Sequence, residues 1–516
     1  MNLIDFFDKS AAAFPHRSVY IFDDRHWSYR EVSNLATRIA RGLMAWGVER
    51  ETKCAVISRN DPLAFTALLG ILKARGAWVP LNPTNATEEN LYLTEFLDVE
   101  VLFYQSEFRA FIQTVIERIP AVRHFVCLDS TGDTGPRLVD WAAAQSDEPI
   151  RLSWDPDAVC MLRPTGGTTG RSKGVMNSNR NFETNIAIFL ACTRFDGPPV
   201  FLACAPMTHA AGVMSFVTIA AAGTVVIQRG FDPQAVLTAI PKYRISSMLL
   251  PPTAIYSVLS QPNVRDFDYT SLRHFFYGGA PTSTAKLREA FEVFGPVMTA
   301  SYGQTEVPTC ATFMGPSELV DENGRLAEER LLSCGRPSPF ARVALMDEEG
   351  HFVPQGAIGE IVVQGGLVMR GYYKNPEATA EVSQNGWHHT GDLAYQDESG
   401  YLYVCDRKKE MIISGGFNVY PAEVEQAVLS HTAVQDCAVV GVPDEKWGEA
   451  VKAVVELKPG CSISADDLLS FCKRHLGSVK APKSVDFVDS LPRSPVGKVL
   501  RKEVRELYWV GHKRRI

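Results

Sequence analysis

Several features that mark other protein classes are missing from this 516-residue sequence. No stretch of about 18 apolar residues occurs without a charge, so no membrane-spanning helix is expected. The first residues, 1–9, lack the basic segment and apolar run of a secretory signal. None of the eleven cysteines forms a Cys-x-x-Cys pair, and many lie in apolar runs. The expectation is a cytoplasmic protein with reduced thiols.

An excess of positive charge is also missing. The formal net charge is −7, from 52 Lys and Arg against 59 Asp and Glu, so there is no basic footprint for a nucleic acid. Clusters with metal-ligand spacing are absent, and the adjacent pair His388–His389 is a poor candidate for a shared zinc ion. The composition, 46% hydrophobic and 22% charged, is that of an ordinary globular protein, and no pattern predicts an oligomeric state.

The length and the pattern of the chain predict more than one domain. A single core stops growing at roughly 250–300 residues, and this chain is longer. Through most of the chain, helical periodicity alternates with short apolar runs. Residues 29–46, with Ser28 as the N-cap, and residues 54–57 are an example of each. This alternation predicts an α/β fold of parallel and mixed sheets with covering helices.

The pattern changes near Ile358, where short strands separated by turn residues predict a β-rich subdomain. The charged run 406–410 follows, and the residues after it combine helical and strand-like segments. We therefore predict a large N-terminal domain, residues 1–407, and a small α+β C-terminal domain, residues 408–516.

The segment 165–175 is the strongest local signal, with the sequence Thr-Gly-Gly-Thr-Thr-Gly-Arg-Ser-Lys-Gly-Val. Glycine lets the backbone approach a ligand closely, and exposed amides and threonine hydroxyls donate to phosphate oxygens. A Walker A loop would need Gly-Lys followed by Ser or Thr, but here Lys173 follows Ser172 and precedes Gly174. The segment predicts a polyphosphate-binding loop outside the P-loop kinases. A flexible surface loop is the alternative.

Further motifs follow this loop in order along the chain. They occupy residues 206–212, 278–281, 302–306, 390–392, 406–407, 414–421 and 492–501. Together with residues 73–81, their order and spacing resemble the adenylate-forming superfamily, and within it the AMP-dependent acyl- and aryl-CoA ligases. The resemblance covers nearly the whole chain.

The resemblance implies a two-step reaction. A carboxylate attacks the α-phosphate of ATP, which yields an acyl-adenylate and pyrophosphate. The thiol of coenzyme A then attacks the acyl carbon, and AMP leaves. Because the first step brings one anion onto another, the site must offset negative charge as it moves.

The resemblance also implies a nucleotide site. The glycine/threonine loop would bind the β- and γ-phosphates, residues 278–281 would form one wall around adenine, and Tyr302 would stack on its other face. Asp392 would accept from both ribose hydroxyls, with Arg407 beside it. The implied nucleotide-binding residues are Thr165, Gly166, Gly167, Thr168, Thr169, Gly170, Lys173, Gly278, Gly279, Ala280, Pro281, Tyr302, Gly303, Asp392 and Arg407.

Two loop residues depart from the usual pattern of the family. Gly166 stands where Ser is frequent, which removes a hydroxyl donor but keeps the amide. Ser172 stands where Pro is frequent, which loosens the loop. ATP binding is still expected.

Four residues are implied as catalytic. Lys498 would reach both the carboxylate and the α-phosphate, and Thr305 would bond the α-phosphate. Glu306 would bind Mg²⁺, since a carboxylate facing a triphosphate without a cation would repel it. His209 would line the acyl pocket and gate entry of the thiol.

The small domain is implied to be mobile, with a hinge near Lys409. Lys498 would serve adenylation, and rotation would then bring in the loop 414–421 for thioester formation. Gly415 and Gly416 would let the pantetheine arm of coenzyme A pass close to the backbone.

Other functions share these motifs. The main alternative is a stand-alone adenylating enzyme that loads a carrier-protein thiol. A luciferase-like oxygenase and a catalytically silent binding protein with the same fold are further alternatives. The identity of the acid stays open among fatty, branched, alicyclic and aryl acids. Amino acids are less expected, because apart from Glu306 no acidic residue near His209 or Gly303 suggests an amino group on the substrate.

Overall fold

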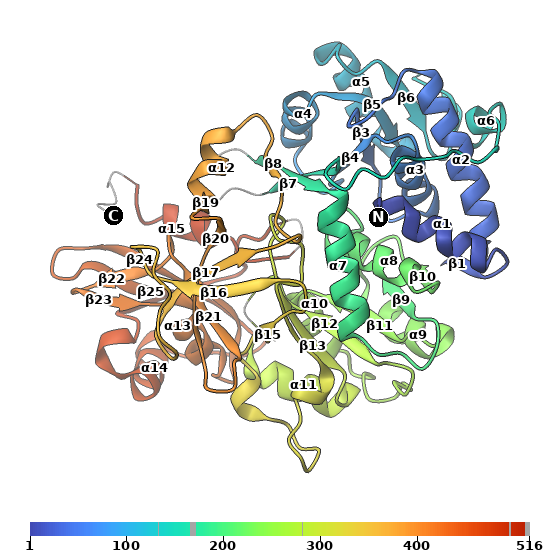
Figure 1. The fold of residues 1–516 in the computed structure, drawn as a ribbon. Coiled ribbons are helices and arrows are strands. Elements are labelled where there is room, and N and C mark those ends of the chain that lie inside the picture. Colours follow the sequence, from blue (N-terminus) through green and yellow to red (C-terminus); the bar gives the residue numbers. More distant parts are fainter. Residues whose placement is uncertain (133, 166–171, 281, 495–496, 511–516) are drawn as a thin grey trace.

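A computed structural model describes residues 1–516 except 133, 166–171, 281, 495–496 and 511–516. The described residues form two large sheets, a smaller β-rich unit and a C-terminal unit with its own sheet (Figure 1). The prediction of an α/β fold with a β-rich subdomain and a small α+β unit is confirmed.

The first large sheet is parallel in its centre and antiparallel at its edges. Its strand order is β15 (Arg336–Pro337), β14 (Thr312–Met314), β13 (Met298–Tyr302), β12 (His274–Tyr277), β11 (Ser247–Leu250), β9 (Val200–Ala203), β10 (Thr224–Ile227), β1 (Ser18–Phe22) and β2 (Arg25–Ser28).

The second large sheet is mostly parallel, with β8 and β18 antiparallel at one edge. Its order is β18 (Gly371–Tyr372), β8 (Lys173–Ser178), β7 (Val159–Thr165), β4 (Ala77–Leu81), β3 (Lys53–Ile57), β5 (Val99–Tyr104) and β6 (His124–Cys127).

Two smaller sheets follow in the chain. The β-rich unit has the order β16 (Arg342–Met346), β17 (Gly359–Gln364), β20 (Trp387–Gln396) and β19 (Ser383–Gln384), with β21 (Leu402–Arg407) paired to β20. The C-terminal sheet has the order β23 (Phe417–Val419), β22 (Ile412–Ser414), β25 (Gly448–Leu457) and β24 (Val434–Asp444), with β26 (Ser484–Val488) paired to β25.

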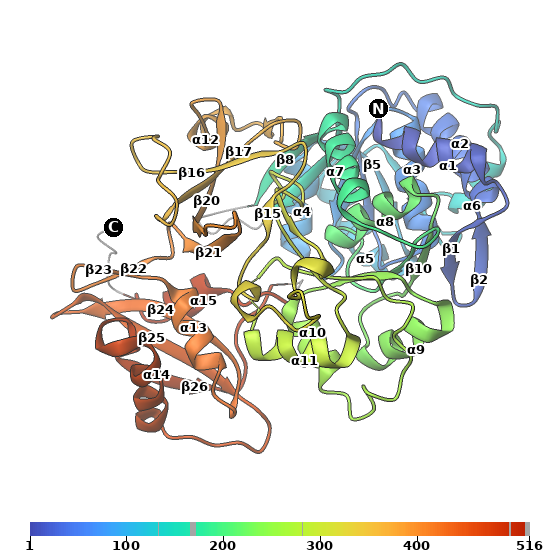
Figure 2. The ribbon, with the colours of Figure 1, turned by 60° about the horizontal axis from the view of Figure 1, so that its bottom comes forward.

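Helices cover these sheets and separate the two large ones (Figures 1 and 2). They are α1 (Leu3–Ala13), α2 (Tyr29–Ala45), α3 (Pro62–Lys73), α4 (Thr87–Phe96), α5 (Arg109–Arg118), α6 (Leu138–Ala143), α7 (Asn179–Cys192), α8 (Ala210–Ala220), α9 (Pro233–Tyr243), α10 (Pro252–Leu259), α11 (Thr284–Phe294), α12 (Pro376–Val382), α13 (Pro421–Leu429), α14 (Ala465–Lys480) and α15 (Arg501–Glu506). Short 3₁₀ turns occupy Ser106–Phe108, Pro316–Glu318 and Glu328–Arg330.

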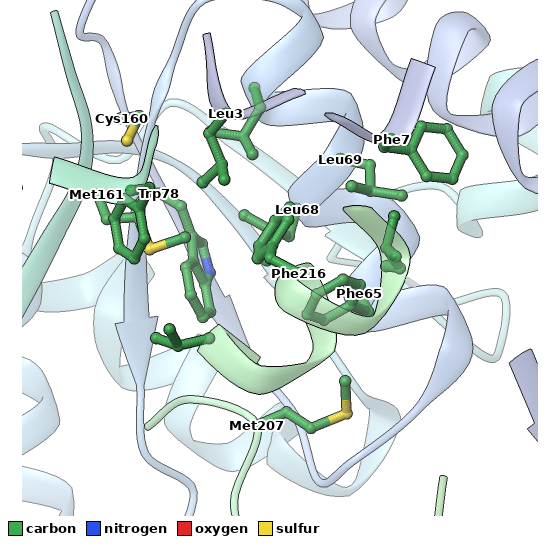
Figure 3. Packing of buried hydrophobic residues seen from close by; sticks show 14 of the residues in the cluster. Leu3, Phe7, Phe65, Leu68, Leu69, Trp78, Cys160, Met161, Met207 and Phe216 are labelled. Carbon is green, nitrogen blue, oxygen red and sulfur yellow. The ribbon is translucent and has the colours of Figure 1, made fainter. Parts of the chain in front are cut away.

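The main core lies between the two large sheets, where α3 and α8 are buried on almost every side. Figure 3 shows Phe65 and Leu68 of α3 close to Phe216 of α8, with Trp78 of β4 beside them. The rings of Phe65 and Phe216 have centroids 5.1 Å apart. A helix that is apolar all round is stable only when neighbours enclose it, so these two helices fix the spacing of the sheets.

Local sequence signals set several boundaries. Ser28 caps α2 as predicted, because its side chain accepts from the amide of Glu31 and the Glu31 carboxylate accepts from the Ser28 amide. Asp61 caps α3, since its carboxylate accepts from the Leu63 amide, and Pro62 occupies the first turn. All eleven cysteines carry free thiols. No described helix has the length and apolar character needed to cross a bilayer.

A charge cluster around Arg501 joins the C-terminal unit to the rest of the molecule. The Arg501 guanidinium bonds Asp406 of β21 over 2.7 Å, Glu410 over 2.8 Å and Glu425 of α13 over 2.7 Å. The arginine side chain is only 14% exposed. Burial raises the pKa of Asp406 and of Glu425, and the arginine opposes this shift in both. One buried cation therefore holds three carboxylates from separate segments together.

Replacement of Arg501 by Met should destabilise the protein strongly, because three acidic groups would lose their shared cation. We expect the free energy of unfolding to fall by about 3–5 kcal/mol. Lys502→Met is the matched control, since its ion pair with Glu506 spans 3.6 Å at the surface and should contribute under about 1 kcal/mol. Equal denaturant midpoints for the two variants would contradict this account.

Candidate active site

The two ends of the predicted phosphate-binding loop lie where β7 and β8 meet. Thr165 and Lys173 are the last paired residues of these strands. The Lys173 amine lies 4.5 Å from the centre of the Tyr372 ring, and the Tyr372 hydroxyl donates to Oε1 of Glu306 over 2.8 Å. The structure thus brings the loop lysine and the predicted magnesium ligand together. The loop residues Gly166, Gly167, Thr168, Thr169 and Gly170 lie outside the described residues.

Thr305 and Glu306 stand in a tight turn after β13. An added Cβ at Gly303 would lie 2.6 Å from a backbone carbonyl oxygen of this turn, so a side chain there would prevent its closure. Asn177 of β8 donates to the carbonyl oxygen of Thr305 over 3.1 Å, and the Met369 amide donates to that of Glu306 over 2.8 Å. Strand β8 and the residues just before β18 therefore hold the backbone of both predicted catalytic residues.

The predicted adenine wall follows β12, the neighbour of β13 in the first large sheet. Gly279 has a φ of 78°, in the left-handed region that glycine tolerates best. A Cβ at Gly278 would lie 2.9 Å from the carbonyl oxygen of Ser301. Gly278, Gly279 and Ala280 therefore emerge beside the strand that ends at Tyr302. Pro281 lies outside the described residues.

Asp392 is the acceptor on which several donors converge. Its Oδ2 accepts from the Tyr302 hydroxyl over 2.6 Å and from the Gln304 amide over 2.7 Å. Arg407 lies directly opposite Asp392 on β21, with its Nε 3.3 Å from Oδ1. Burial and then the Asp392 carboxylate raise the pKa of Tyr302 well above its usual value, so its hydroxyl remains a donor. Asp392 is held in one orientation by two other segments, residues 302–304 and β21.

Lys498 belongs to the C-terminal unit, and the charges of Arg407 and Asp392 act on its amine. The backbone around it is fixed by a hydrogen bond of 2.7 Å from the Ser494 amide to its carbonyl oxygen, and the Thr253 hydroxyl of α10 lies 3.5 Å from the Gly497 carbonyl oxygen. The side chain remains accessible to solvent, yet enclosure by protein and the charge of Arg407 lower the pKa of Lys498. The amine is therefore open to solvent on one side and within the electric field of the Asp392–Arg407 pair.

His209 precedes the first turn of α8, and its Nδ1 lies 2.9 Å from the Thr208 hydroxyl. Burial and the nearby charge of Arg163 lower the pKa of His209 to about 4. The imidazole is therefore neutral at physiological pH and adds no positive charge to the site.

Three residues of this region were not predicted as functional. Gln304 stands inside the 302–306 motif, which was a usable signal. No sequence signal marks Tyr372 or Arg163 as functional, because each lies in a segment that shows only ordinary strand character. Only the packing of distant segments places them beside Glu306.

Gly415 and Gly416 lie apart from this cluster. They form the turn between β22 and β23, with φ values of 60° and 82°, and the Gly415 amide donates to the carbonyl oxygen of Trp447 over 2.8 Å. Figures 1 and 2 place this hairpin at the outer end of the C-terminal sheet, away from β7 and β8. Among the described residues, Lys173 and Glu306 meet at Tyr372, and Tyr302 and Arg407 meet at Asp392, whereas the predicted pantetheine loop lies apart.

Comparison with known proteins agrees with this arrangement. A family model for AMP-binding enzymes matches residues 7–373, and a model for the AMP-binding enzyme C-terminal domain matches residues 423–498. A feruloyl-CoA synthase from Amycolatopsis sp is 37% identical over 97% of this chain and 98% of its own length. A medium/long-chain-fatty-acid–CoA ligase from Mycobacterium tuberculosis is 36% identical, over 92% of this chain and 85% of its own length.

Solved structures show the same likeness. ATP-bound MatB from Rhodopseudomonas palustris has a TM-score of 0.89 at 29% identity and is covered over 100% of its chain and 99% of this one. The amide bond synthetase McbA from Marinactinospora thermotolerans also has a TM-score of 0.89 at 29% identity, over 98% of this chain and 100% of its own.

The fold and the cluster around Asp392 define an adenylate-forming enzyme. The chain belongs to the AMP-binding enzyme family, and within it to the acyl-CoA ligases.

The depressed pKa of His209 predicts an acid-sensitive contribution to stability. An unfolded histidine binds a proton below its ordinary pKa of 6.5, whereas folded His209 does so only near 4. Its contribution is therefore complete above pH 6.5 and is lost as the pH falls toward 4. Between pH 7 and 5, the free energy of unfolding should fall less for His209→Asn than for wild type.

The control for this prediction is His351→Asn, because the His351 side chain is 78% exposed. This variant should keep the pH dependence of the wild type. Parallel stability curves for wild type and His209→Asn would contradict the assignment of a buried, neutral imidazole.

Proposed function

We propose that the chain is an AMP-forming acyl-CoA ligase, which converts a carboxylic acid, ATP and CoA into acyl-CoA, AMP and pyrophosphate through an acyl-adenylate. The observation that carries this proposal is the Asp392–Arg407 pair in the N-terminal part of the chain, whose charges act on the amine of Lys498 from the C-terminal unit. An amine there can offset the charge that develops when the carboxylate meets the α-phosphate.

The nucleotide would lie along the cluster described above. Asp392 would exchange its contacts with Tyr302 and Gln304 for the ribose hydroxyls, and Tyr302 would stack on adenine against the wall at 278–280. Thr165 and Lys173 would bind the terminal phosphates with the loop between them, and Thr305 would bind the α-phosphate.

Glu306 fits the role of a magnesium ligand. Its Oε1 is held by the Tyr372 hydroxyl, and among the described residues no hydrogen bond reaches Oε2. Magnesium prefers such oxygen ligands and bridges phosphate groups. When bound, the ion would offset the charge of the triphosphate, and the carboxylate of Glu306 would hold it in place.

The chemistry of the two steps assigns tasks to this chain's own residues. A carboxylate oxygen forms a bond to the α-phosphorus while the bond to pyrophosphate breaks, and Lys498 stabilises both anions. The thiol of CoA then forms a bond to the acyl carbon, AMP leaves, and the thiol proton passes to solvent. Neutral His209 would line the thiol's path and take no part in proton transfer.

The second step requires a different position of the C-terminal unit. The hairpin with Gly415 and Gly416 lies away from β20, which carries Asp392, while the Asp392 charge acts on the amine of Lys498. We therefore assign this structure to the adenylating arrangement of domains 1–407 and 408–516, with rotation about Lys409. The free thiols of all eleven cysteines favour a reducing cytoplasm as the compartment.

A screen of fatty, branched, alicyclic and aryl acids with ATP, Mg²⁺ and CoA tests the function directly. We expect equal amounts of AMP and CoA thioester from at least one acid. Lys498→Ala should lower formation of the acyl-adenylate by about 10²–10³-fold and leave thioester formation from supplied acyl-adenylate nearly unchanged.

Lys502→Ala is the matched control for that variant, because it removes a neighbouring lysine at the surface. The same acids should be tested with a holo-carrier protein in place of CoA. A relative from Streptomyces coeruleorubidus that is 32% identical over 97% of this chain is a fatty acid–[acyl-carrier-protein] ligase. Thioester formation on the carrier and none on CoA would overturn the CoA assignment.

A further inference from the structure

Arg163 is a buried cation that has no hydrogen-bond partner among the residues that the structure describes. It lies on β7, two residues before Thr165, and only 7% of it is exposed. Its Nη1 is buried and makes no hydrogen bond. No other hydrogen bond or ion pair joins its guanidinium to the described residues. Arg163 is the one charged residue of β7, and its neighbours Met161 and Leu162 are apolar core residues.

The surroundings of Arg163 belong to the adenylating site. In the β7–β8 pair it lies opposite Val175, whose side chain packs with Tyr372. The Tyr372 hydroxyl in turn bonds Glu306. The charge of Arg163 acts on His209 on one side and is stabilised by Glu306 on the other. Arg163, Val175 and Tyr372 therefore form one row across β7, β8 and β18, and this row leads to the predicted metal ligand Glu306.

The free-energy cost of burying Arg163 without a hydrogen-bond partner points to a ligand that binds there. A buried charge without a hydrogen-bond partner costs several kcal/mol, and a guanidinium has five donors to satisfy. Glu306 offsets part of this cost by its charge alone. That share shrinks when Glu306 serves as a magnesium ligand, as the proposed function requires. An incoming oxyanion would supply the missing acceptor at the moment of turnover.

We propose that Arg163 is a substrate-binding residue whose guanidinium donates to a carboxylate oxygen of the acid before adenylation. The inference rests on the proposed function and adds a residue to its acid site. A carboxylate and a phosphate share the chemistry that a guanidinium recognises. The carboxylate is favoured because Arg163 adjoins His209, whereas Lys173 and the loop next to it serve the phosphate side.

The two half-reactions should depend on this contact differently. Before adenylation the acid carries a full negative charge, which the guanidinium binds strongly. Once the bond to phosphorus has formed, the acyl group is a neutral ester and its carbonyl oxygen is a weaker acceptor. Arg163 should therefore contribute to capture of the acid and contribute little to transfer of the acyl group to CoA.

The test is Arg163→Gln, measured by pyrophosphate release at varied acid and at varied ATP, with an acid that the wild type accepts. A lost hydrogen bond to a charged group corresponds to about a 10- to 100-fold effect. We expect the KM for the acid to rise by that factor and the KM for ATP to change less than about twofold. Arg163→Lys, which keeps the charge, should fall between the two proteins.

Two controls distinguish a binding role of Arg163 from a structural role. Arg180→Gln removes an arginine that is 48% exposed and pairs with Asp157 at the surface, and it should leave both KM values unchanged. Supplied acyl-adenylate and CoA bypass capture of the acid, so Arg163→Gln should form thioester at the wild-type rate. That reaction also demonstrates that the variant is folded. Should it not fold, Arg163→Lys provides the same comparison.

Three results would overturn the inference. An unchanged KM for the acid would show that Arg163 does not contact the carboxylate. A raised KM for ATP alone would show that Arg163 binds a phosphate. Equal loss of both half-reactions would show that Arg163 has a structural role. Failure of the proposed function is a separate result, because the wild type would then release no AMP with any acid.

Discussion

The account depends on Asp392 and on the positive groups that gather around it. One carboxylate on β20 accepts from Tyr302 and Gln304, pairs with Arg407, and lies near the amine of Lys498. Tyr302, Gln304 and Arg407 belong to the N-terminal part of the chain, and Lys498 belongs to the C-terminal part. Because a carboxylate accepts several hydrogen bonds at once, Asp392 can exchange protein donors for ribose hydroxyls without becoming an unpaired buried charge.

The same principle governs the rest of the site. The reaction joins two anions, so cations must surround the place where they meet without being neutralised in advance. Lys173 lies over an aromatic ring instead of against a carboxylate, and Arg163 has no hydrogen-bond partner among the described residues. Glu306 is held by a hydroxyl and keeps one oxygen without a hydrogen bond. Such incomplete pairing costs stability, and Arg501, with its three carboxylates, marks the contrasting case of a fully paired structural cation.

Much of this organisation could be predicted from the sequence, because its signals are local. Ser28 caps a helix as predicted, and the motif at 302–306 pointed to Tyr302 and Glu306, although not to the turn that Gly303 makes possible. The remainder depends on distant segments. Tyr372 meets Glu306 only because β18 pairs with β8, and the isolation of Arg163 appears only once β7 is buried. The roles of Lys409, Gly415 and Gly416 remain predictions, since they concern a second arrangement of the C-terminal unit.

The most direct test of the central claim is to lock the C-terminal unit where this structure holds it. A Cβ built at Gly497 would lie 2.9 Å from the Thr253 hydroxyl oxygen, so cysteines at these two positions would bring their sulfur atoms together. The oxidised double variant should form acyl-adenylate and pyrophosphate but no CoA thioester, and a reductant should restore the second step. Thioester formation by the oxidised variant at the rate of the single variants would contradict the account.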